Sequence, residues 1–443
     1  MKIKTDSRKI KKGDIFVALN NFNDGGKYVI DAIKNGASKV VVSEGIYDVE
    51  TIITTDTKQY LIKFLKSKYY NKIKGIKLIG VTGTNGKTTT AFLIYEALNK
   101  ANIKCGYIGT NGFYLDKKIK NLNNTTPDIL ELYELLLEAK RNGCQYMTIE
   151  ASSHALDQRR LGGLLFDIVI FTNLTLEHQN YHKTMENYAI AKQKLFNMVK
   201  KDGFTIVNID DEYKKYFLKQ NSITYGFKDS DNRIISYESY LYGTTFRIND
   251  QEYKTKLIGK YNIYNLVAVI SCLKILKIQN IFDIIKELDV PSGRMEKIIY
   301  KKNLIIIDYA HTPDGTQKVL EAVNEIKQKK LYVIVGCGGG ENKDKRSLIG
   351  EIVTNMADYV IFTNDNPRDE DELNIINDII QNVDKKNYEI IINRKKAIEK
   401  GIQMLKKNDI LIVLGKGHES FQVIKGKKIL FNDKETVLDI IRR

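Results

Sequence analysis

Short apolar segments alternate with amphipathic segments along most of the chain, a pattern typical of α/β proteins. The segments at 77–83, 144–150 and 166–174 are almost continuously apolar, as strands of a parallel sheet covered on both faces usually are. Helical periodicity occupies 88–102 and 128–143 between them. The middle of the chain is therefore predicted to form a doubly wound parallel sheet.

The flanking regions extend this pattern. Near the start, strands are predicted at 14–19 and 39–44, with an amphipathic helix at 28–36 between them. Toward the end, four apolar strands recur at strand–helix spacing and predict a second, Rossmann-like parallel α/β domain. These strands are at 304–310, 331–338, 359–365 and 410–417.

One stretch departs from the alternation. Residues 203–258 are rich in Tyr, Thr and Ile with little helical period, which predicts a small β-rich insertion, and a helix follows at 260–276. We therefore expect an α/β protein of three domains, with boundaries at 1–74, 75–290 and 291–443.

The composition is that of an ordinary globular protein, with 43% hydrophobic and 28% charged residues among 443. No apolar run approaches the roughly 18 residues that a membrane span needs, and the N-terminus lacks the long apolar stretch of a secretory signal. We expect a cytoplasmic protein without membrane insertion. The four cysteines show no CxxC spacing, so they suggest neither a zinc site nor a disulfide framework and are expected to be reduced and at least partly buried.

The formal net charge of +16 raises the possibility of nucleic-acid binding. Lysines are spread along the whole chain rather than gathered in one segment, so a general compositional bias explains the charge better. The charge would still attract an anionic substrate over long range. A P-loop ATPase acting on nucleic acid remains the alternative from a different functional class.

The strongest chemical signal is a glycine-rich turn between a strand and a helix, Gly80-Val-Thr-Gly83-Thr-Asn-Gly86-Lys87-Thr88-Thr89. In this context backbone N–H groups and the helix N-terminus would surround phosphate oxygens. Lys87 would reach the β- and γ-phosphates, and the Thr88 hydroxyl would bind Mg²⁺. The turn departs from the common GxxxxGK[ST] pattern, whose first glycine would fall at Val81. A glycine turn beside an unrelated lysine is the alternative.

Polar residues follow two strands of the predicted central sheet. Glu150 ends one strand, where its carboxylate would suit Mg²⁺, although a carboxylate that caps the following helix is the alternative. His178 lies beyond the next strand, and a histidine there is more often a packed or surface group than a ligand. Lys192 falls in a helical segment, where an exposed lysine is the alternative.

The strands of the C-terminal region also end in polar residues, where open α/β sheets bind ligands. Asp308 and His311 follow the first of these strands, and Asp308 could hydrogen-bond a ribose. The turn GCGGG at 336–340 is a weak dinucleotide signal, because the GxGxxG pattern would put its last glycine at Glu341. DNPR at 365–368 and GKGHE at 415–419 end two more strands.

Together these motifs resemble those of the Mur ligases, and within that family those of the UDP-N-acetylmuramyl-tripeptide synthetases. The resemblance covers nearly the whole chain. No single motif decides it, but the ordered series is very specific. In chain order the motifs are DSR, GDIFVA, TGTNGKTT, NTTPD, EASSHAL, NYH with AKxxLF, NIYN, GRME, DYAHTPD, DNPR and GKGHE.

The resemblance implies a UDP-binding N-terminal domain, a central P-loop ATPase domain, and a C-terminal domain that brings an amino acid. Ser7 would contact the uridine diphosphate end of the substrate. The residues implied for the muramyl-peptide are Asn124, Thr125, Thr126, Ser152, Gln158, Arg160 and Lys192. Those implied for ATP are Gly83, Thr84, Asn85, Gly86, Lys87, Thr88, Thr89, Asn265, Arg294, Asp308 and His311. The implied metal ligands are Thr88, Glu150, His178 and Lys192, the last as a carbamate; Lys87, Glu150, His178 and Lys192 would be catalytic.

The implied activity is ATP-dependent, ADP-forming amide-bond synthesis with Mg²⁺. It adds a third residue to UDP-N-acetylmuramoyl-L-alanyl-D-glutamate through an acyl phosphate on the D-glutamate γ-carboxylate. The expected partners are this UDP-linked dipeptide and a diamino acid, with no nucleic acid, and the chain is expected to be monomeric. The sister folylpolyglutamate synthetases share the phosphate loop but lack the DSR and GDIFVA region and the NTTPD, DNPR and GKGHE motifs found here.

The identity of the amino acid is less clear. The residues implied to bind it are Asp365, Asn366, Pro367, Arg368, Gly415 and Glu419. Arg368 favours a diamino diacid, because a guanidinium can clamp a second carboxylate that lysine lacks, and Glu419 suits an ammonium group. Glu341 departs from the arginine typical of diaminopimelate-adding relatives, and Lys343 or Arg346 would have to compensate. We expect meso-diaminopimelate first, its thioether analogue meso-lanthionine second and L-lysine third.

Overall fold

The structure is a computed structural model that describes residues 2–19, 25–340 and 343–442. The chain forms two compact units. The first comprises Met1–Thr82, Asn102–Ile170 and His178–Thr205, and the second Gly83–Ala101, Phe171–Glu177 and Ile206–Arg443. The three domain boundaries expected from the sequence stay a prediction.

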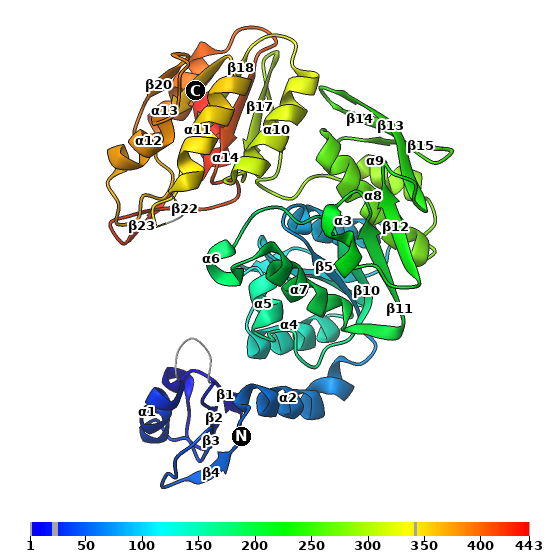
Figure 1. Ribbon diagram of the computed structural model, residues 1–443, viewed down its shortest axis with the longest axis vertical. Helices are drawn as coiled ribbons and strands as arrows, with labels where there is room; N and C mark the ends of the chain where they lie inside the picture. The colour runs from blue at the N-terminus through cyan, green and yellow to red at the C-terminus, as the bar shows by residue number, and fades with distance from the viewer. Residues whose placement is uncertain (1, 20–24, 341–342, 443) are drawn as a thin grey trace. The chain divides into compact units, whose positions relative to one another are not determined.

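The first unit begins with a small parallel sheet in the order β1-β2-β3-β4 (Figure 1). Alternate side chains of β2 and β3, among them Phe16 and Val40, pack with Val29 and Ala32 of α1 into one core. The elements are β1 Ile3–Lys4, the short 3-10 helix Ser7–Lys9, β2 Ile15–Val17, the 3-10 turn Gly25–Tyr28, α1 Val29–Lys34, β3 Lys39–Val42, β4 Glu50–Ile53 and α2 Thr57–Ile73.

The larger sheet of the first unit has the order β11-β10-β5-β9-β6-β7-β8. β5 and β6 pair in parallel with β9 on either side, whereas β7 and β8 are antiparallel additions. Helix α2 packs against α4, and α5 against α7. The elements are β5 Lys77–Thr82, β6 Cys105–Gly109, β7 Gly112–Tyr114, β8 Lys118–Lys120, α4 Ile129–Arg141, β9 Tyr146–Glu150, α5 Ser153–Asp157, β10 Phe166–Phe171, α6 Gln179–His182, α7 Met185–Phe196 and β11 Val199–Asn208.

The second unit contains α3, which follows the glycine-rich turn, and strands β12 to β15, which continue from the end of β11. β13, β14 and β15 form an antiparallel ribbon, and α3 packs against α8. The elements are α3 Lys87–Lys100, the 3-10 helix Glu212–Tyr216, β12 Ser222–Gly226, β13 Asn232–Tyr240, β14 Gly243–Ile248, β15 Gln251–Thr255, α8 Lys260–Ile275 and α9 Ile281–Glu287.

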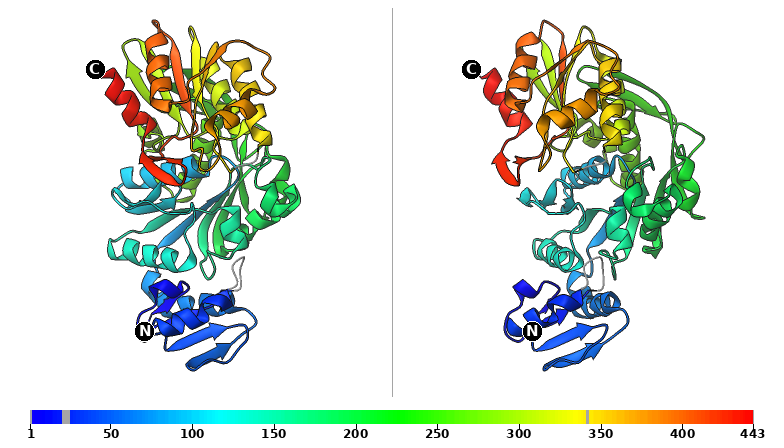
Figure 2. Two further views of the ribbon diagram at one scale, coloured as in Figure 1. Left: turned by 90° about the vertical axis from the view of Figure 1, so that its left-hand side faces the viewer. Right: turned by 60° about the vertical axis from the view of Figure 1, so that its left-hand side comes forward.

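The C-terminal part of the second unit is a sheet in the order β16-β17-β21-β18-β19-β20, parallel except for β16. Alternate residues of β17 face opposite sides: Leu304 and Ile306 pack with α10, α11 and α12, whereas Ile305 and Ile307 pack with α13 and α14. Figures 1 and 2 show these helices beside the sheet. Both faces are therefore covered, which explains the nearly continuous apolar strands. The elements are β16 Glu296–Tyr300, β17 Asn303–Asp308, α10 Pro313–Ile326, β18 Leu331–Val335, α11 Asp344–Met356, β19 Tyr359–Phe362, α12 Glu372–Ile380, β20 Tyr388–Ile390, α13 Arg394–Met404, β21 Ile410–Leu414, β22 Phe421–Ile424, β23 Lys427–Leu430 and α14 Asp433–Ile441.

The strands and helices predicted from apolar patterning are confirmed, including the β-rich stretch before α8. The predicted buried, reduced thiols are confirmed as well, since Cys105, Cys144, Cys272 and Cys337 are all free and buried. None of the helices that the structure describes is both long and apolar enough to cross a membrane. The α/β class with parallel sheets covered by helices is therefore as expected from the sequence.

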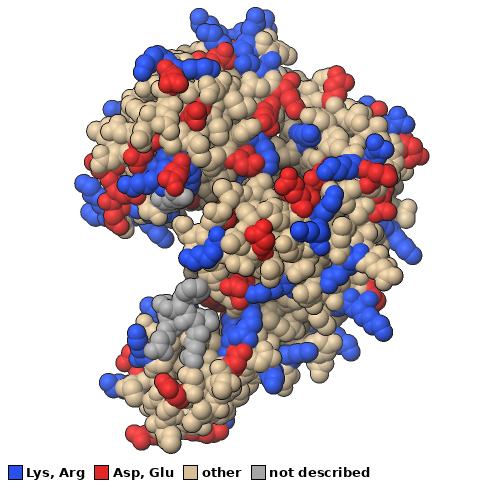
Figure 3. Space-filling model, viewed as in Figure 1, with Lys and Arg blue, Asp and Glu red and all other residues tan. Residues whose placement is uncertain are grey.

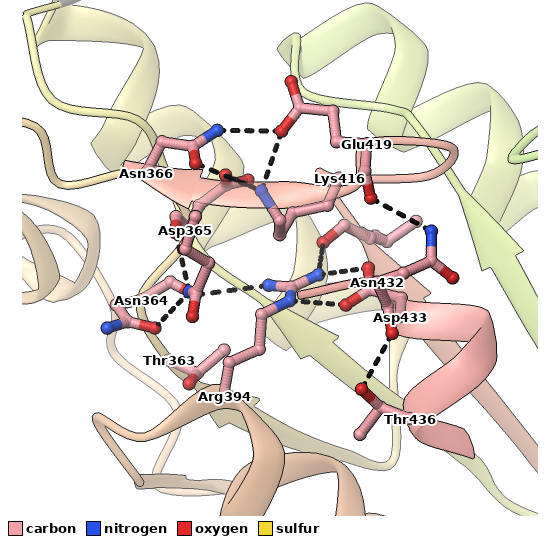
Figure 4. Close-up of polar contacts among 12 residues, drawn as sticks. Thr363, Asn364, Asp365, Asn366, Arg394, Lys416, Glu419, Asn432, Asp433 and Thr436 are labelled. Atoms are coloured by element: carbon pink, nitrogen blue, oxygen red, sulfur yellow. Dashed lines mark hydrogen bonds and ion pairs between the residues drawn. The ribbon is translucent and has the colours of Figure 1, made fainter. Parts of the chain in front are cut away.

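A fully buried ion pair joins the last two helices of the C-terminal sheet (Figure 4). Arg394 at the start of α13 donates from Nε and Nη2 to the two oxygens of Asp433, both at 2.7 Å. Nη2 also donates to the Leu414 carbonyl at 2.8 Å and Nη1 to the Asn364 carbonyl at 3.3 Å. One guanidinium therefore fixes the carboxyl ends of β19 and β21, from which the DNPR and GKGHE segments begin.

Breaking this pair on one side leaves a buried charge without compensation, which costs about 3–5 kcal/mol. We expect Asp433→Asn to lower Tm by about 3–5 °C in a thermal melt. The double variant Arg394→Met with Asp433→Leu should recover much of that loss, because both charges are gone. The exposed ion pair of Glu287 with Lys256 provides the control, and Glu287→Gln should change Tm very little. A full-size Tm loss in the double variant would contradict the charge argument.

Candidate active site

The glycine-rich turn between β5 and α3 has the backbone that a phosphate loop requires. Gly83 and Gly86 have φ values of 151° and 82°, in the region that favours glycine. A Cβ at Gly83 would overlap the Thr172 hydroxyl, and one at Gly86 would overlap the Asn265 amide oxygen. Space and backbone conformation thus both require glycine at these positions.

Residues 172–175 hold the loop through a set of hydrogen bonds. Thr84 N donates to the Asn173 carbonyl at 2.7 Å, and Asn85 N donates to Asn173 Oδ1 at 3.0 Å. In return, Thr172 Oγ1 donates to the Asn85 carbonyl at 2.7 Å. The loop is therefore ordered by protein contacts alone.

Lys87, at the first position of α3, lies within the loop. Its ammonium donates to the carbonyls of Gly83 at 2.9 Å and Thr84 at 2.6 Å. Thr88 and Thr89 are buried in the same first turn. Cation, hydroxyl and helix N-terminus therefore lie together, which is the donor set that binds phosphate oxygens. Phosphate binding by Lys87 stays a prediction.

Two residues from other parts of the second unit reach the loop. Asn265 Oδ1, on α8, accepts a hydrogen bond from Thr90 at 3.2 Å and lies against Gly86. Asp314, in the first turn of α10, accepts from Asn85 Nδ2 at 2.7 Å. Asn265 was implied by the resemblance, whereas Asp314 was missed, although it stands within the DYAHTPDG segment.

Glu150 is fully buried in the first unit at the end of β9. Its Oε1 accepts from the Tyr107 hydroxyl and from Thr110 N at 2.9 Å, and its Oε2 from Thr110 Oγ1 at 3.2 Å. The helix-cap alternative is wrong, because Ser152 caps α5 by accepting from Ala155 N at 3.3 Å. Three donors therefore fix the orientation of this buried carboxylate, and its role as a metal ligand stays a prediction.

His178 belongs to a cluster of aromatic rings in the first unit. Its ring centroid lies 4.8 Å from that of His154 and 5.9 Å from that of Tyr188. His178 itself is exposed and has a left-handed backbone, with φ of 56°. Burial lowers the pKa of the neighbouring His182 to about 4, and His154 adds to that shift.

Lys192 is only 1% exposed, so the alternative of an exposed helix residue is wrong. Its ammonium lies 4.3 Å from the centroid of the Tyr188 ring. Glu150, His178 and Lys192 all belong to the first unit, and Thr88 to the second. No group of three or more His, Cys, Asp or Glu side chains arranged to hold a metal occurs among the described residues. Glu150 supplies carboxylate oxygens, which Mg²⁺ prefers, whereas the Lys192 ammonium carries no oxygen and would need to become a carbamate to bind the metal.

Hydrogen bonds in the first unit join four of the residues implied for the muramyl-peptide, Thr126, Ser152, Gln158 and Arg160. Thr126 Oγ1 donates to the Glu150 carbonyl at 2.6 Å and accepts from Ser152 N at 3.1 Å. Arg160 donates to the Thr126 carbonyl at 3.0 Å and from Nε and Nη2 to Gln158 Oε1 at 3.0 and 2.8 Å. The Thr125 and Thr110 hydroxyls share a hydrogen bond of 3.0 Å, and Asn124 is exposed. Ser7 is buried in the small sheet region, where its carbonyl accepts from Asn35 at 3.1 Å.

The residues implied for the nucleotide in the C-terminal domain surround Tyr309. The Arg294 guanidinium lies 4.7 Å from the Tyr309 ring centroid, and the His311 ring lies 4.8 Å from it. Asp308 is buried and accepts from the backbone N–H of Met295 and of Ala310, both at 2.7 Å. Burial raises the pKa of Asp308, and Arg294 opposes that shift.

The segments DNPR and GKGHE meet at the ends of β19 and β21 (Figure 4). Asn366 Nδ2 donates to Glu419 Oε2 at 2.8 Å. Lys416 is fully buried and donates to that same Glu419 oxygen at 2.7 Å, to Asn366 Oδ1 at 3.1 Å and to the Phe421 carbonyl at 2.7 Å. Burial raises the pKa of Asp365, which lies against Gly415, and Arg394 and Lys416 oppose that shift. Lys416 was missed, although its motif was found.

Arg368 follows Pro367 with a left-handed backbone, φ 55°, and an exposed side chain. Its N–H donates to the Val423 carbonyl at 2.8 Å, so the β22–β23 hairpin holds its backbone. Its Nη1 donates to the Gly339 carbonyl at 2.6 Å. The guanidinium is thereby brought to the glycine-rich turn after β18.

Lys343 and Arg346, the two candidates to compensate for Glu341, differ in exposure and in the partners they already have. Glu341 itself lies outside the described residues, and Lys343 is exposed. Arg346 is fully buried and already bound to Glu370 at 2.9 and 3.1 Å and to Asp378 at 2.7 Å. The bond to Arg346 lowers the pKa of Glu370 to about 2. Arg346 as a partner for a substrate carboxylate is therefore wrong, because two protein carboxylates already occupy it.

Comparisons with known proteins agree with these motifs. The Mur ligase middle domain matches residues 81–273, and the Mur ligase glutamate ligase domain matches residues 293–417. The chain is 38% identical to the UDP-N-acetylmuramoyl-L-alanyl-D-glutamate–2,6-diaminopimelate ligase of Clostridium perfringens over 99% of this chain and 94% of that protein. It is 39% identical to the enzyme of the same name from Aquifex aeolicus, over 99% and 93%.

A solved structure of a UDP-N-acetylmuramoyl-L-alanyl-D-glutamate–2,6-diaminopimelate ligase has a TM-score of 0.73 at 31% identity, over 99% of this chain and 94% of that one. Both sequence and fold are thus shared along the full length of these relatives. The family resemblance seen in the motifs is confirmed, and the chain belongs to the Mur ligase family.

Proposed function

We propose that this protein is an ATP-dependent, ADP-forming ligase that adds a diamino acid to UDP-N-acetylmuramoyl-L-alanyl-D-glutamate. The observation that carries the proposal is the similarity over 99% of the chain, at 38–39% identity, to ligases named for this reaction. The phosphate loop, the Thr126–Arg160 cluster and the Asn366–Glu419 pair provide separate groups for nucleotide, UDP-linked peptide and amino acid. The protein acts in the cytoplasm as a monomer.

The chemistry follows from the weakness of a carboxylate as an acyl donor. Transfer of the ATP γ-phosphate to the D-glutamate γ-carboxylate makes an acyl phosphate, and the incoming amine then displaces phosphate. Lys87 and the N–H groups of the loop neutralise charge on the transferring group. Mg²⁺, when bound, would stabilise the same charge, and Thr88, Glu150, His178 and carbamylated Lys192 would hold it.

The remaining residues bind and orient. Arg294, Asp308, His311 and Asn265 contact the nucleotide, and Ser7 the uridine diphosphate. Ser152, Gln158 and Arg160, with residues 124–126, hold the muramyl-peptide, and the DNPR and GKGHE segments position the amine. Holding amine and acyl phosphate together converts a bimolecular step into an intramolecular one.

Action on nucleic acid is the second candidate, suggested by the net charge of +16. On the face shown in Figure 3, Lys and Arg are interspersed with Asp and Glu rather than gathered in one basic patch. ATP turnover separates the candidates. Turnover that requires the UDP-linked dipeptide and an amino acid supports the ligase, whereas turnover stimulated by DNA or RNA alone contradicts it.

Lys192→Ala should reduce ligation roughly 100-fold or more, because the carbamate would supply oxygen ligands that Mg²⁺ prefers. Short-chain carboxylic acids should restore part of the activity by replacing the lost carboxylate. Lys194→Ala is the matched control, since that lysine is two residues away and its side chain is 43% exposed. Full activity of Lys192→Ala would overturn the assignment.

Lys87→Ala and Glu150→Gln should abolish acyl-phosphate formation and leave affinity for the UDP-linked dipeptide close to that of the unaltered protein. Glutamine keeps the size of Glu150, so the hydrogen bonds that reach Thr110 and Thr125 are disturbed least. Calorimetric titration measures the binding, and trapping of the acyl phosphate measures the chemistry. Loss of affinity in both variants would contradict the separation of the binding and phosphoryl-transfer residues.

The choice of amino acid depends on Arg368 and Glu419. Glu419 Oε2 is occupied by Lys416 and Asn366, so Oε1 is the oxygen that would receive a substrate ammonium. Arg368, held by the hairpin and by Gly339, would receive a second carboxylate. Both contacts favour a meso-diamino diacid, and only the ammonium contact is available to L-lysine.

In competition at equal concentration, meso-diaminopimelate should be incorporated first, meso-lanthionine second and L-lysine third. Arg368→Gln should lower the preference for diaminopimelate over L-lysine by roughly 10- to 100-fold, the value of a charged hydrogen-bonded contact. Mass spectrometry of the products measures the ratio. Preferential incorporation of L-lysine by the unaltered enzyme would show that Arg368 is not a diacid clamp.

A further inference from the structure

Lys58 is a buried lysine whose ammonium lacks a partner. It lies in the first turn of α2 and is 5% exposed. Across residues 2–19, 25–340 and 343–442 its ammonium makes no hydrogen bond or ion pair. Most of the side chain is buried, and only its Nζ end keeps contact with solvent. Holding an ammonium in such a mostly buried position without an opposite charge costs free energy, which a bound anion would offset.

The surroundings of Lys58 add to this cost. The charges that act on it are Asp128, which is attractive, and Arg159 and Arg160, which are repulsive. The first turn of a helix also disfavours a cation, because the helix dipole is positive there. Burial, with the two arginines adding to it, lowers the pKa of Lys58 to about 8.

The nearby carboxylates are already paired with the arginines. Arg159 binds Asp56 through two bonds of 2.7 and 2.9 Å, and Arg160 lies 3.4 Å from Asp128. Three cations therefore share two carboxylates, and Lys58 is the surplus positive charge. Arg160 is also the residue that holds Gln158 and the Thr126 carbonyl, within the group implied for the muramyl-peptide.

We propose that Lys58 is a substrate-binding residue whose ammonium receives an anionic oxygen of the UDP-linked dipeptide, either of its diphosphate or of its glutamate carboxylates. The proposal rests on the proposed function, because it takes its ligand from that reaction. The anion supplies the missing partner, and the surplus charge beside Arg160 attracts it. Binding of the anion keeps Lys58 protonated, because a neighbouring negative charge raises the pKa of its ammonium.

The test compares Lys58→Met, which keeps the apolar stem and removes the charge, with Lys58→Arg, which keeps the charge. Lys63→Met is the matched control, because Lys63 is an exposed lysine on the same helix. Calorimetric titration with the UDP-linked dipeptide should give at least a roughly tenfold loss of affinity for Lys58→Met, partial recovery for Lys58→Arg and no change for Lys63→Met.

Titration with UDP alone distinguishes the two sources of the anion. An equal loss for UDP and for the UDP-linked dipeptide assigns the contact to the diphosphate. A loss confined to the dipeptide assigns it to a carboxylate. Unchanged affinity for both ligands overturns the proposal. If the protein binds the dipeptide through Lys58 but ligates none of the diamino acids, the proposed function fails and this inference stands.

Two further readouts separate binding from a structural role. Lys58→Met should keep or raise Tm, because it removes the cost of a buried unpaired charge, whereas a structural role would lower Tm. Affinity of the unaltered protein should fall as the pH rises above about 8, where the free ammonium loses its proton; the charged groups that act on it are Asp128, Arg159 and Arg160. That fall should be absent in Lys58→Met. A lowered Tm with an unchanged pH profile would refute the substrate contact.

Discussion

Removing a charged side chain from water costs several kcal/mol, and the candidate site of this protein contains many such side chains. Glu150, Asp308, Asp365, Arg394 and Lys416 are all buried. Each is stabilised by hydrogen bonds or opposite charges from residues distant in the chain. The cost of burial therefore fixes the orientation of each side chain, because a buried charged group that moves away from its partner finds no water to replace it.

The parallel sheets determine where these charges lie. The interior of β17 is covered by helices on both faces and carries only apolar side chains, Leu304 to Ile307. Polar groups are admitted where the strand ends and the helix has not begun. Glu150, Asp308 and Asp365 all occupy such positions, at the ends of β9, β17 and just beyond β19. Burial between helices therefore determines both distributions: apolar residues lie within the strands, and charged residues lie at their carboxyl ends.

The same distinction explains what the sequence could predict. Continuous apolar strands and the glycine-rich turn are local features, so β5, β9, β17 and the phosphate loop were recognisable from their letters. Short, exposed strands such as β8 and β23 carry no such pattern. Pairings were beyond reach as well. Arg346 meets carboxylates 24 and 32 residues away, and nothing in the letters shows that it is occupied. Lys416 lay inside a recognised motif, yet its three acceptors appear only when β19 and β21 are placed together.

The contrast between Lys416 and Lys58 shows how a buried lysine can be interpreted. Lys416 has three oxygen acceptors and a neighbouring pair of carboxylates, so the protein itself accounts for its burial. Lys58 is buried to a similar degree and faces two arginines with one attractive carboxylate. Evolution of a more stable chain would replace such a residue with an apolar one of the same length, since removing an uncompensated charge favours folding. Lys58 lies beside Arg160 even though it lowers stability, and recognition of an anion explains why it is kept. Binding sites generally contain uncompensated groups of this kind, which cost stability and serve function.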